Sequence, residues 1–269
     1  MWQRHWNLDH DPFGARRPGF VATPTHSEAV ARLAHTIETA GRSARLVAGA
    51  GLGKSTVLAR AIEATRAPTR RFARATGPVD GADLFATLAA GLGSRSGLDA
   101  GRAEAWRALV EAARLCRWQG IQVVLAVDDC RALATPADRV DLERLEGLDP
   151  DPAARLTVIR LGRPELGPED EPTRADWGLL IRLDPLTRSE SASYVEAKLG
   201  AAGRPEATFT PRALTRLHAL SGGVPRGLDR IAGLALMAGA VRGLEVVPPE
   251  VVDAAARECL APEGLPADA

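Results

Sequence analysis

Apolar residues follow two different spacings along the chain, one in the first two thirds and another in the last third. The first part contains short apolar runs, some of them β-branched, with helical spacing between most of them. These strand-like runs cover residues 44–47, 71–75, 121–127, 156–161 and 179–183. Strands that alternate with helices are typical of a parallel sheet covered on both faces. The pattern therefore predicts an α/β fold for this part of the chain.

After Thr187 the spacing is helical throughout. Glycine and proline separate four helical segments, at residues 189–199, 211–220, 225–241 and 249–260. We therefore expect a small all-helical domain over 187–260, behind a sheet domain over 44–186. Residues 1–43 contain an amphipathic helix pattern and are expected to pack on the sheet domain. Residues 261–269 have few apolar side chains, which predicts a flexible tail.

Between the first strand-like run and a helical run at 57–64 lies a glycine-rich segment, Ala48-Gly49-Ala50-Gly51-Leu52-Gly53-Lys54-Ser55-Thr56. Glycine allows the backbone to turn tightly and to bring its N–H groups to phosphate oxygens, and the following helix offers its positive N-terminus to the same anion. Lys54 is expected to reach the β and γ phosphates, and the Ser55 hydroxyl to bind Mg²⁺. Nucleotide contacts are expected from Gly49, Ala50, Gly51, Leu52, Gly53, Lys54, Ser55 and Thr56. The strand before and the helix after favour a phosphate-binding loop over a glycine-rich turn with a chance lysine.

The use of lysine supports this interpretation independently. The chain has 34 lysine and arginine residues, but only Lys54 and Lys198 are lysines. Position 54 therefore departs from a strong preference for arginine. A compact ammonium fits inside a loop wrapped around phosphate, whereas a planar guanidinium does not.

Composition narrows the classes of function. Of the 269 residues, 45% are hydrophobic and 25% charged, as in ordinary globular proteins, and the formal net charge is zero. A neutral chain has no overall field that attracts nucleic acid or an anionic membrane. The arginine-rich segment 69–74 is either a local basic patch or a strand with a solvated face.

No apolar run approaches the roughly 20 residues that span a bilayer, and the first residues lack a signal peptide, so we expect a cytoplasmic protein. The three cysteines are odd in number and lack metal-ligand spacing, so we expect no structural zinc and no disulfide framework.

A second motif ends the third strand-like run, where Val123-Val124-Leu125-Ala126-Val127 is followed by Asp128 and Asp129. Carboxylates at the C-terminal end of a parallel strand lie where α/β sheets place their ligands. We expect Asp128 to bind Mg²⁺ and Asp129 to orient the water that attacks the γ-phosphate of a bound nucleotide. Asp129 is one methylene shorter than the glutamate usual at this position, which predicts slow turnover. The alternative is that two aspartates simply end a buried strand.

Several further motifs carry a resemblance when taken in order. Trp6-Asn7-Leu8, Asp11-Pro12-Phe13 and Pro24-Thr25-His26 precede the loop, and Leu161-Gly162-Arg163-Pro164-Glu165-Leu166, Leu183-Asp184-Pro185-Leu186, Phe209-Thr210-Pro211 and Ser221-Gly222-Gly223-Val224-Pro225-Arg226 follow it. With the two phosphate-site motifs, this order resembles the general secretion pathway protein A (ExeA-like) branch of the AAA+ ATPases. ATPase subunits of transposition systems share much of the layout.

The resemblance implies a RecA-like AAA+ nucleotide-binding domain over 44–186, an α/β P-loop NTPase fold, followed by a helical lid over 187–260. It implies that Phe13 and His26 border the nucleotide base, although a core phenylalanine and a helix-capping histidine remain open. It also implies that Arg226 contacts the γ-phosphate and reports ATP to the lid, the alternative being a surface arginine.

Three departures from the family pattern affect the expected activity. Arg163 stands where the family usually has a polar amide residue near the γ-phosphate, and it either binds there or pairs with Asp128 or Asp129. Asp176 aligns with the family's arginine finger, for which Arg174 substitutes only if the loop is shifted. Family members often extend into a membrane span, whereas this chain ends after the lid, so recruitment to the inner membrane would come through partners.

Together these observations predict an ATP- and Mg²⁺-binding AAA+ ATPase or nucleotide switch that converts ATP and water to ADP and phosphate slowly, with Asp129, Lys54 and Arg226 as catalytic residues. It would act through a protein partner or a homo-oligomer, in secretion or pilus-type machinery by resemblance. The alternatives are a transposition-type, DNA-associated ATPase, which the neutral charge disfavours, and a scaffold that binds ATP without hydrolysing it.

Overall fold

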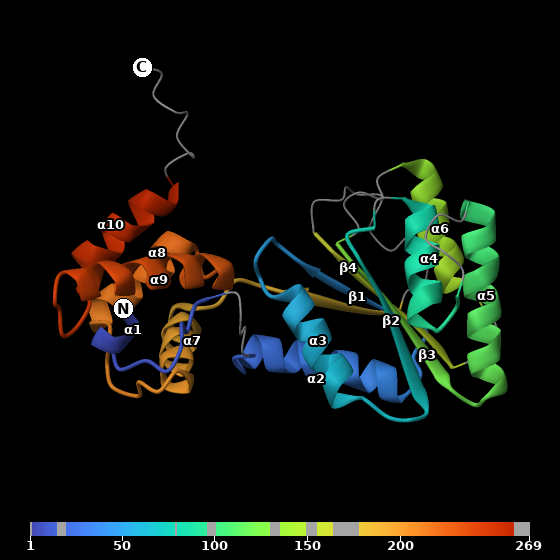
Figure 1. Cartoon of the computed structure of the whole chain (residues 1–269), viewed down its shortest axis with the longest axis horizontal. Helices are drawn as coiled ribbons and strands as arrows, with labels where there is room; N and C mark the ends of the chain where they lie inside the picture. The colour runs from blue at the N-terminus through green and yellow to red at the C-terminus, as the bar shows by residue number, and fades with distance from the viewer. Residues whose placement is uncertain are drawn as a thin grey trace, which may run out of the picture. The chain divides into compact units, whose positions relative to one another are not determined.

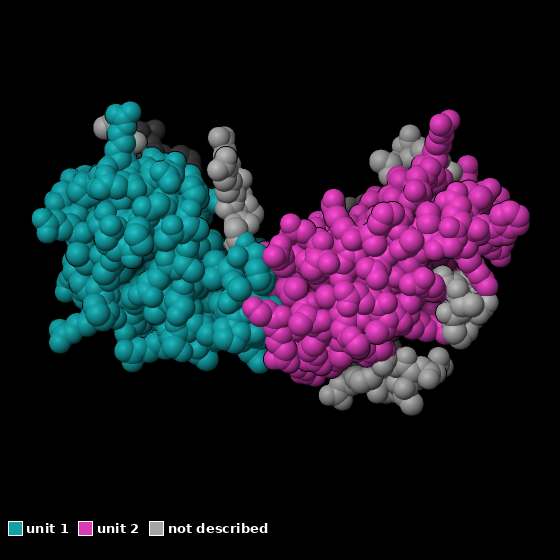
Figure 2. Space-filling view, turned by 90° about the horizontal axis from the view of Figure 1, so that it is seen from below, with its two compact units in different colours: residues 1–26, 51–53, 184–269 teal, residues 27–50, 54–183 magenta. Residues whose placement is uncertain are grey.

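The computed structural model describes residues 2–14, 20–78, 80–95, 101–129, 135–148, 155–163 and 178–260. They form two compact units (Figure 2). One, here called the sheet unit, comprises residues 27–50 and 54–183; the other, the helical unit, comprises residues 1–26, 51–53 and 184–269.

The sheet unit contains a five-stranded sheet in the order β2-β3-β4-β1-β5, and every neighbouring pair is parallel. Its strands are β1 (Ser43–Ala48), β2 (Arg70–Thr76), β3 (Gln122–Asp128), β4 (Leu156–Gly162) and β5 (Leu179–Leu183). All seven residues of β3 are buried, as expected for a central strand whose apolar side chains face helices on both sides. The predicted α/β fold is confirmed, and each predicted strand is present to within one residue at either end.

Helices cover both faces of this sheet. They are α2 (Pro24–Glu38), α3 (Lys54–Ala64), α4 (Gly81–Gly91), α5 (Arg102–Trp118) and α6 (Pro136–Glu146). Figure 1 shows α4, α5 and α6 together on one side of the sheet and α2 and α3 on the other. Right-handed crossovers produce this division, because the chain moves in one direction along the sheet from β1 to β2 and in the other from β2 to β4. Both faces of the central strands are thereby removed from water.

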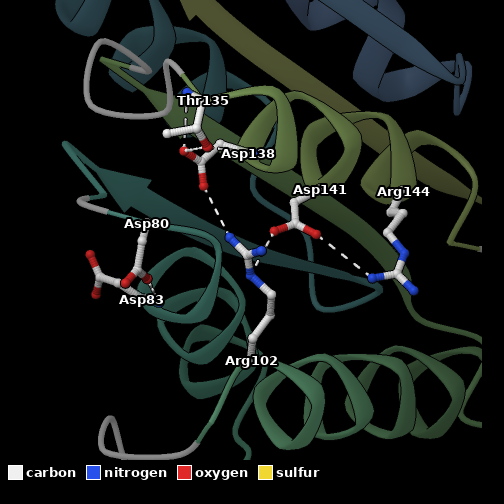
Figure 3. Close-up of polar contacts among 7 residues, drawn as sticks. All are labelled: Asp80, Asp83, Arg102, Thr135, Asp138, Asp141 and Arg144. Atoms are coloured by element: carbon white, nitrogen blue, oxygen red, sulfur yellow. Dashed lines mark hydrogen bonds and ion pairs between the residues drawn. The ribbon is translucent and has the colours of Figure 1, made fainter.

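A network of ion pairs to two buried carboxylates joins α5 to α6 (Figure 3). Arg102, the first residue of α5, places its guanidinium 3.1 Å from Asp138 Oδ1 and 3.1 Å from Asp141 Oδ2. The two carboxylate side chains on α6 are only 6% and 3% exposed. Thr135 caps α6, since its hydroxyl accepts from the Asp138 N–H while Asp138 accepts from the Thr135 N–H. Arg102 therefore pairs with two buried carboxylates, and Arg144 Nη1 also lies 3.7 Å from Asp141 Oδ1.

The helical unit consists of α1 (Trp2–His5), α7 (Arg188–Ala201), α8 (Pro211–Ser221), α9 (Pro225–Val241) and α10 (Pro249–Leu260). The four predicted helices are present to within two residues at either end. Thr187 and Thr210 cap α7 and α8 by accepting from backbone N–H groups one turn later, and proline begins α8 and α9. These starts follow directly from the sequence.

Trp6 packs in the core of the helical unit. Its ring is 1% exposed, and its Nε1 donates to the Leu236 carbonyl of α9 at 2.9 Å. The Arg204 guanidinium lies 5.2 Å from the ring centroid. The expected N-terminal segment 1–43 is thus divided in the structure: Trp6 and its neighbours belong to the helical unit, whereas α2 from residue 27 onward belongs to the sheet unit.

Candidate nucleotide-binding site

Sheet order brings the predicted phosphate-site residues of the sheet unit to one edge. Because all five strands are parallel, their C-terminal ends lie at the same edge. The glycine-rich loop follows β1, Arg163 follows β4 and Asp128 ends β3; β4 lies between β1 and β3. In open parallel sheets, ligands bind at such a point, where connections leave neighbouring strands in opposite directions.

Two glycines of the loop have left-handed backbones. Gly51 and Gly53 have φ angles of 79° and 88°, in the left-handed region that favours glycine. A Cβ on Gly53 would lie 2.9 Å from His26 Nε2, and one on Gly51 would lie 2.9 Å from Arg226 Cβ. Both positions therefore exclude other residues by conformation and by space.

Lys54 begins α3, and Ser55 and Thr56 follow it in the first helical turn. The Lys54 Nζ donates to the carbonyl oxygens of Ala48 at 2.7 Å and Gly49 at 3.0 Å. The ammonium is therefore turned back over the loop, as expected of a cation that serves the interior of the loop. Ser55 is exposed, so its hydroxyl is accessible to a ligand at the positive end of α3.

His26 lies within the first turn of α2 and is 6% exposed. Its Nε2 lies 2.9 Å from the Leu52 carbonyl oxygen, and its Nδ1 lies 2.7 Å from Thr23 Oγ1. Because a carbonyl only accepts, Nε2 carries a proton, and the Thr23 hydroxyl donates to Nδ1 when the ring is neutral. Both ring nitrogens thus bond within the protein, and one of them fixes the backbone of the loop.

The segment before Arg226 forms a turn at two glycines. Gly222 and Gly223 have φ angles of 61° and 71°, and a Cβ on Gly223 would lie 2.2 Å from the Leu186 carbonyl oxygen. This turn leads into α9, where the Arg226 N–H donates to the Gly51 carbonyl at 3.3 Å. The sequence predicted a role for the side chain of Arg226, which is exposed in the structure. It did not predict the hydrogen bond from the Arg226 backbone to the loop.

Asp128 is 3% exposed at the end of β3, and its backbone carbonyl accepts from the Gly77 N–H at 2.8 Å. Its Oδ2 forms an ion pair and hydrogen bond with Nη2 of Arg74 from the neighbouring strand β2. Carboxylate and hydroxyl oxygens are the hard ligands that Mg²⁺ prefers, so Asp128 and Ser55 fit this metal in chemical type. The sequence indicated Arg74 only as part of an arginine-rich segment and did not link it to Asp128.

Asp129 has an unusual backbone for a residue other than glycine. Its φ is 61°, and the residue is half-buried. Aspartate and asparagine tolerate this left-handed region better than longer side chains do. The conformation supplies a physical reason for aspartate at this position. Arg163 is also half-buried, one residue beyond β4.

Phe13 packs within the helical unit. Its N–H donates to Asp11 Oδ1 at 2.9 Å, and Lys198 Nζ lies 5.7 Å from its ring centroid. Lys198 is itself paired with both carboxylate oxygens of Asp229 at 2.8 Å. Burial raises the pKa of the Asp229 carboxyl, and the Lys198 ammonium opposes this shift. The second lysine of the chain is therefore part of a buried network beneath Phe13.

Residues Arg174 and Asp176, considered for the arginine finger, lie outside the described residues, as do Pro164-Glu165-Leu166. Among the residues that the structure describes, no helix has the length and apolar composition needed to span a bilayer.

No family model matches the chain. Over 250 residues it is 28% identical to general secretion pathway protein A of Aeromonas hydrophila, an alignment that covers 90% of this chain and 46% of the relative. The chain thus spans about half the length of this curated relative.

Solved structures with a similar fold include the following two. For Drosophila ORC bound to DNA the TM-score is 0.74 at 18% identity, covering 97% of this chain and 66% of that chain. For Cdc6p from Pyrobaculum aerophilum the TM-score is 0.72 at 19% identity, covering 96% and 73%. The chain is therefore similar in sequence to a general secretion pathway protein A, and it has the AAA+ P-loop NTPase fold of the ORC and Cdc6 structures.

Proposed function

We propose that this protein binds ATP with Mg²⁺ and works as a nucleotide switch that hydrolyses ATP slowly. The observation that carries the proposal is the loop between β1 and α3, where Gly51 and Gly53 have left-handed backbones and Lys54 turns its ammonium over the loop. The loop lies at the same sheet edge as the buried carboxylate of Asp128. A triphosphate with a divalent cation is the ligand that matches this set of groups.

Each residue has a definite proposed role. Backbone N–H groups from Gly49 to Thr56 and the Lys54 ammonium bind the phosphates. Ser55 and Asp128 hold Mg²⁺, which neutralises charge on the β and γ phosphates when bound. Asp129 orients the attacking water, and the Arg163 and Arg226 guanidinium groups stabilise charge on the γ-phosphate. Phe13 forms an apolar wall for the base.

His26 has a different proposed role from the one that the resemblance implied. Since both ring nitrogens bond to Thr23 and Leu52, His26 supports nucleotide binding by fixing the loop backbone, without contacting the base. A fixed loop keeps its N–H groups directed at phosphate and reduces the ordering cost of binding.

We further propose that the switch acts on a protein partner or within a homo-oligomer in the cytoplasm, with recruitment to the inner membrane through partners. Similarity to a general secretion pathway protein A supports a role in secretion or pilus-type machinery. A DNA-associated role is the second candidate, because one similar structure is an ORC bound to DNA. The net charge of zero disfavours it, since DNA affinity depends on several phosphate contacts.

The test measures affinity for a fluorescent ATP analogue and phosphate release from ATP, both with Mg²⁺. Lys54→Ala should weaken nucleotide binding and abolish phosphate release. Arg60→Ala, which removes an exposed cation from the same helix, is the matched control and should change neither. Equal affinity in the wild type and in Lys54→Ala would refute the proposed site. Tight binding with no phosphate release in the wild type would favour a scaffold gated by nucleotide occupancy.

A further inference from the structure

Arg74 lies beside the carboxylate that we propose as a metal ligand. Strands β2 and β3 are parallel neighbours, and Thr76 is the register partner of Asp128. Arg74 lies two residues earlier on β2 and therefore points to the same face as Thr76. Its long side chain extends along the strand direction, and Nη2 reaches Asp128 Oδ2.

The two partners differ in their exposure to solvent. The Asp128 side chain is 4% exposed, whereas the Arg74 side chain is 34% exposed. A buried carboxylate without a cation is costly, so Asp128 requires a positive partner in every state of the site. Arg74 supplies that charge from the chain itself, and its partly solvated guanidinium can move away without becoming a buried, unpaired charge.

Mg²⁺ and a guanidinium compete for this carboxylate. An arginine contact to a carboxylate is a charge-assisted hydrogen bond of the strong kind, and Mg²⁺ also requires the oxygen lone pairs. Two cations at one small anion repel each other, and the repulsion is poorly screened where the carboxylate is buried.

We infer that Arg74 determines the metal affinity of the site, because Mg²⁺ must displace its guanidinium from Asp128. This inference rests on the proposed nucleotide function and deepens it. With Arg74 in place, the charge of the Asp128 carboxylate is neutralised without metal, and Mg²⁺ increases the nucleotide affinity only slightly. Without Arg74, Asp128 depends on the metal, and the same gain is large.

The experiment measures the dissociation constant of a fluorescent ATP analogue once with Mg²⁺ and once with EDTA. The readout is the ratio of the dissociation constant in EDTA to the dissociation constant with Mg²⁺. In Arg74→Gln this ratio should increase about tenfold or more over the wild type, the effect of losing one hydrogen bond between charged groups. Arg71→Gln is the matched control: it removes the same charge from the same strand, and its guanidinium instead donates to the Leu92 carbonyl. It should leave the ratio within about twofold of the wild type.

Arg74→Lys is the second variant, in case the glutamine variant does not fold. It keeps the charge, and its shorter, point-like ammonium should give an intermediate ratio. Nucleotide binding with the same ratio in the wild type and in both Arg74 variants would overturn the inference and leave the proposed function intact. Failure of the folded wild type to bind the analogue under either condition would refute the proposed function, and the inference with it.

Discussion

Replacing His26 by alanine tests whether this residue supports the loop or contacts the base. The ring is 6% exposed and bonds to Thr23 Oγ1 and to the Leu52 carbonyl. Each bond contributes about 1 kcal/mol to stability, and the truncation also opens a cavity in a buried position. We therefore expect the free energy of unfolding to fall by about 2–4 kcal/mol, measured by urea denaturation.

The same variant should weaken binding of ATP, GTP and inorganic triphosphate by the same factor, because the loop that it loosens is proposed to bind only the phosphates. His26→Gln should recover about 1 kcal/mol, since its side-chain amide can still donate to Leu52. His35→Ala, an exposed histidine on the same helix, is the matched control and should change little.

Two results would refute this reasoning. One is a change in the ratio of ATP to GTP affinity in His26→Ala with unaltered triphosphate binding, which would make His26 a base contact. The other is a loss of stability no larger than in the His35→Ala control, which would mean that the two hydrogen bonds contribute nothing.

Three further outcomes are expected. In urea titrations, Arg102→Ala should lower the free energy of unfolding by about 3–5 kcal/mol, because it removes the shared partner of two buried carboxylates. The control Arg107→Ala, on the exposed face of α5, should have little effect in the same titration. Asp129→Asn should keep the thermal stability of the wild type, since asparagine tolerates a φ of 61°, but should lose phosphate release; retained release would exclude Asp129 from orienting water. Burial opposes ionisation of Glu190, but hydrogen bonds from the Thr187 N–H and hydroxyl lower its pKa below the ordinary value. The stabilisation that ionised Glu190 gives the folded protein is therefore complete above about pH 4.3, the unfolded pKa, and disappears as pH falls through the lower folded pKa. In thermal melts, Glu190→Gln should be less stable than the wild type at pH 7 and as stable as the wild type in acid.

The sequence predicted the strands and helices well because their causes are local. β3 is a continuous apolar run, α8 begins with threonine and proline, and the loop has glycine where the backbone is left-handed. Such signals depend on neighbours in the chain, and the structure reproduces them within a residue or two.

Contacts between distant residues were not predictable in this way. Trp6 and Leu236 are 230 positions apart, and nothing in the local pattern around Trp6 indicates that it packs against α9. The pairing of Arg74 with Asp128 depends on the register of β2 against β3, which no single segment specifies. The left-handed backbone of Asp129 is likewise a property of how the strand ends, so its preference for a short side chain could be read only from the structure.

The scarcity of lysine has a practical consequence for chemical labelling. Lys198 is 8% exposed and paired with Asp229, so an amine-reactive reagent reaches it poorly in the folded protein. The other lysine of the chain, Lys54, is half-buried in the loop, where its Nζ donates to the Ala48 and Gly49 carbonyls, so the rate of its acylation depends on the state of the loop. Acylation followed by mass spectrometry would therefore report occupancy of the loop at a single residue, without an engineered probe.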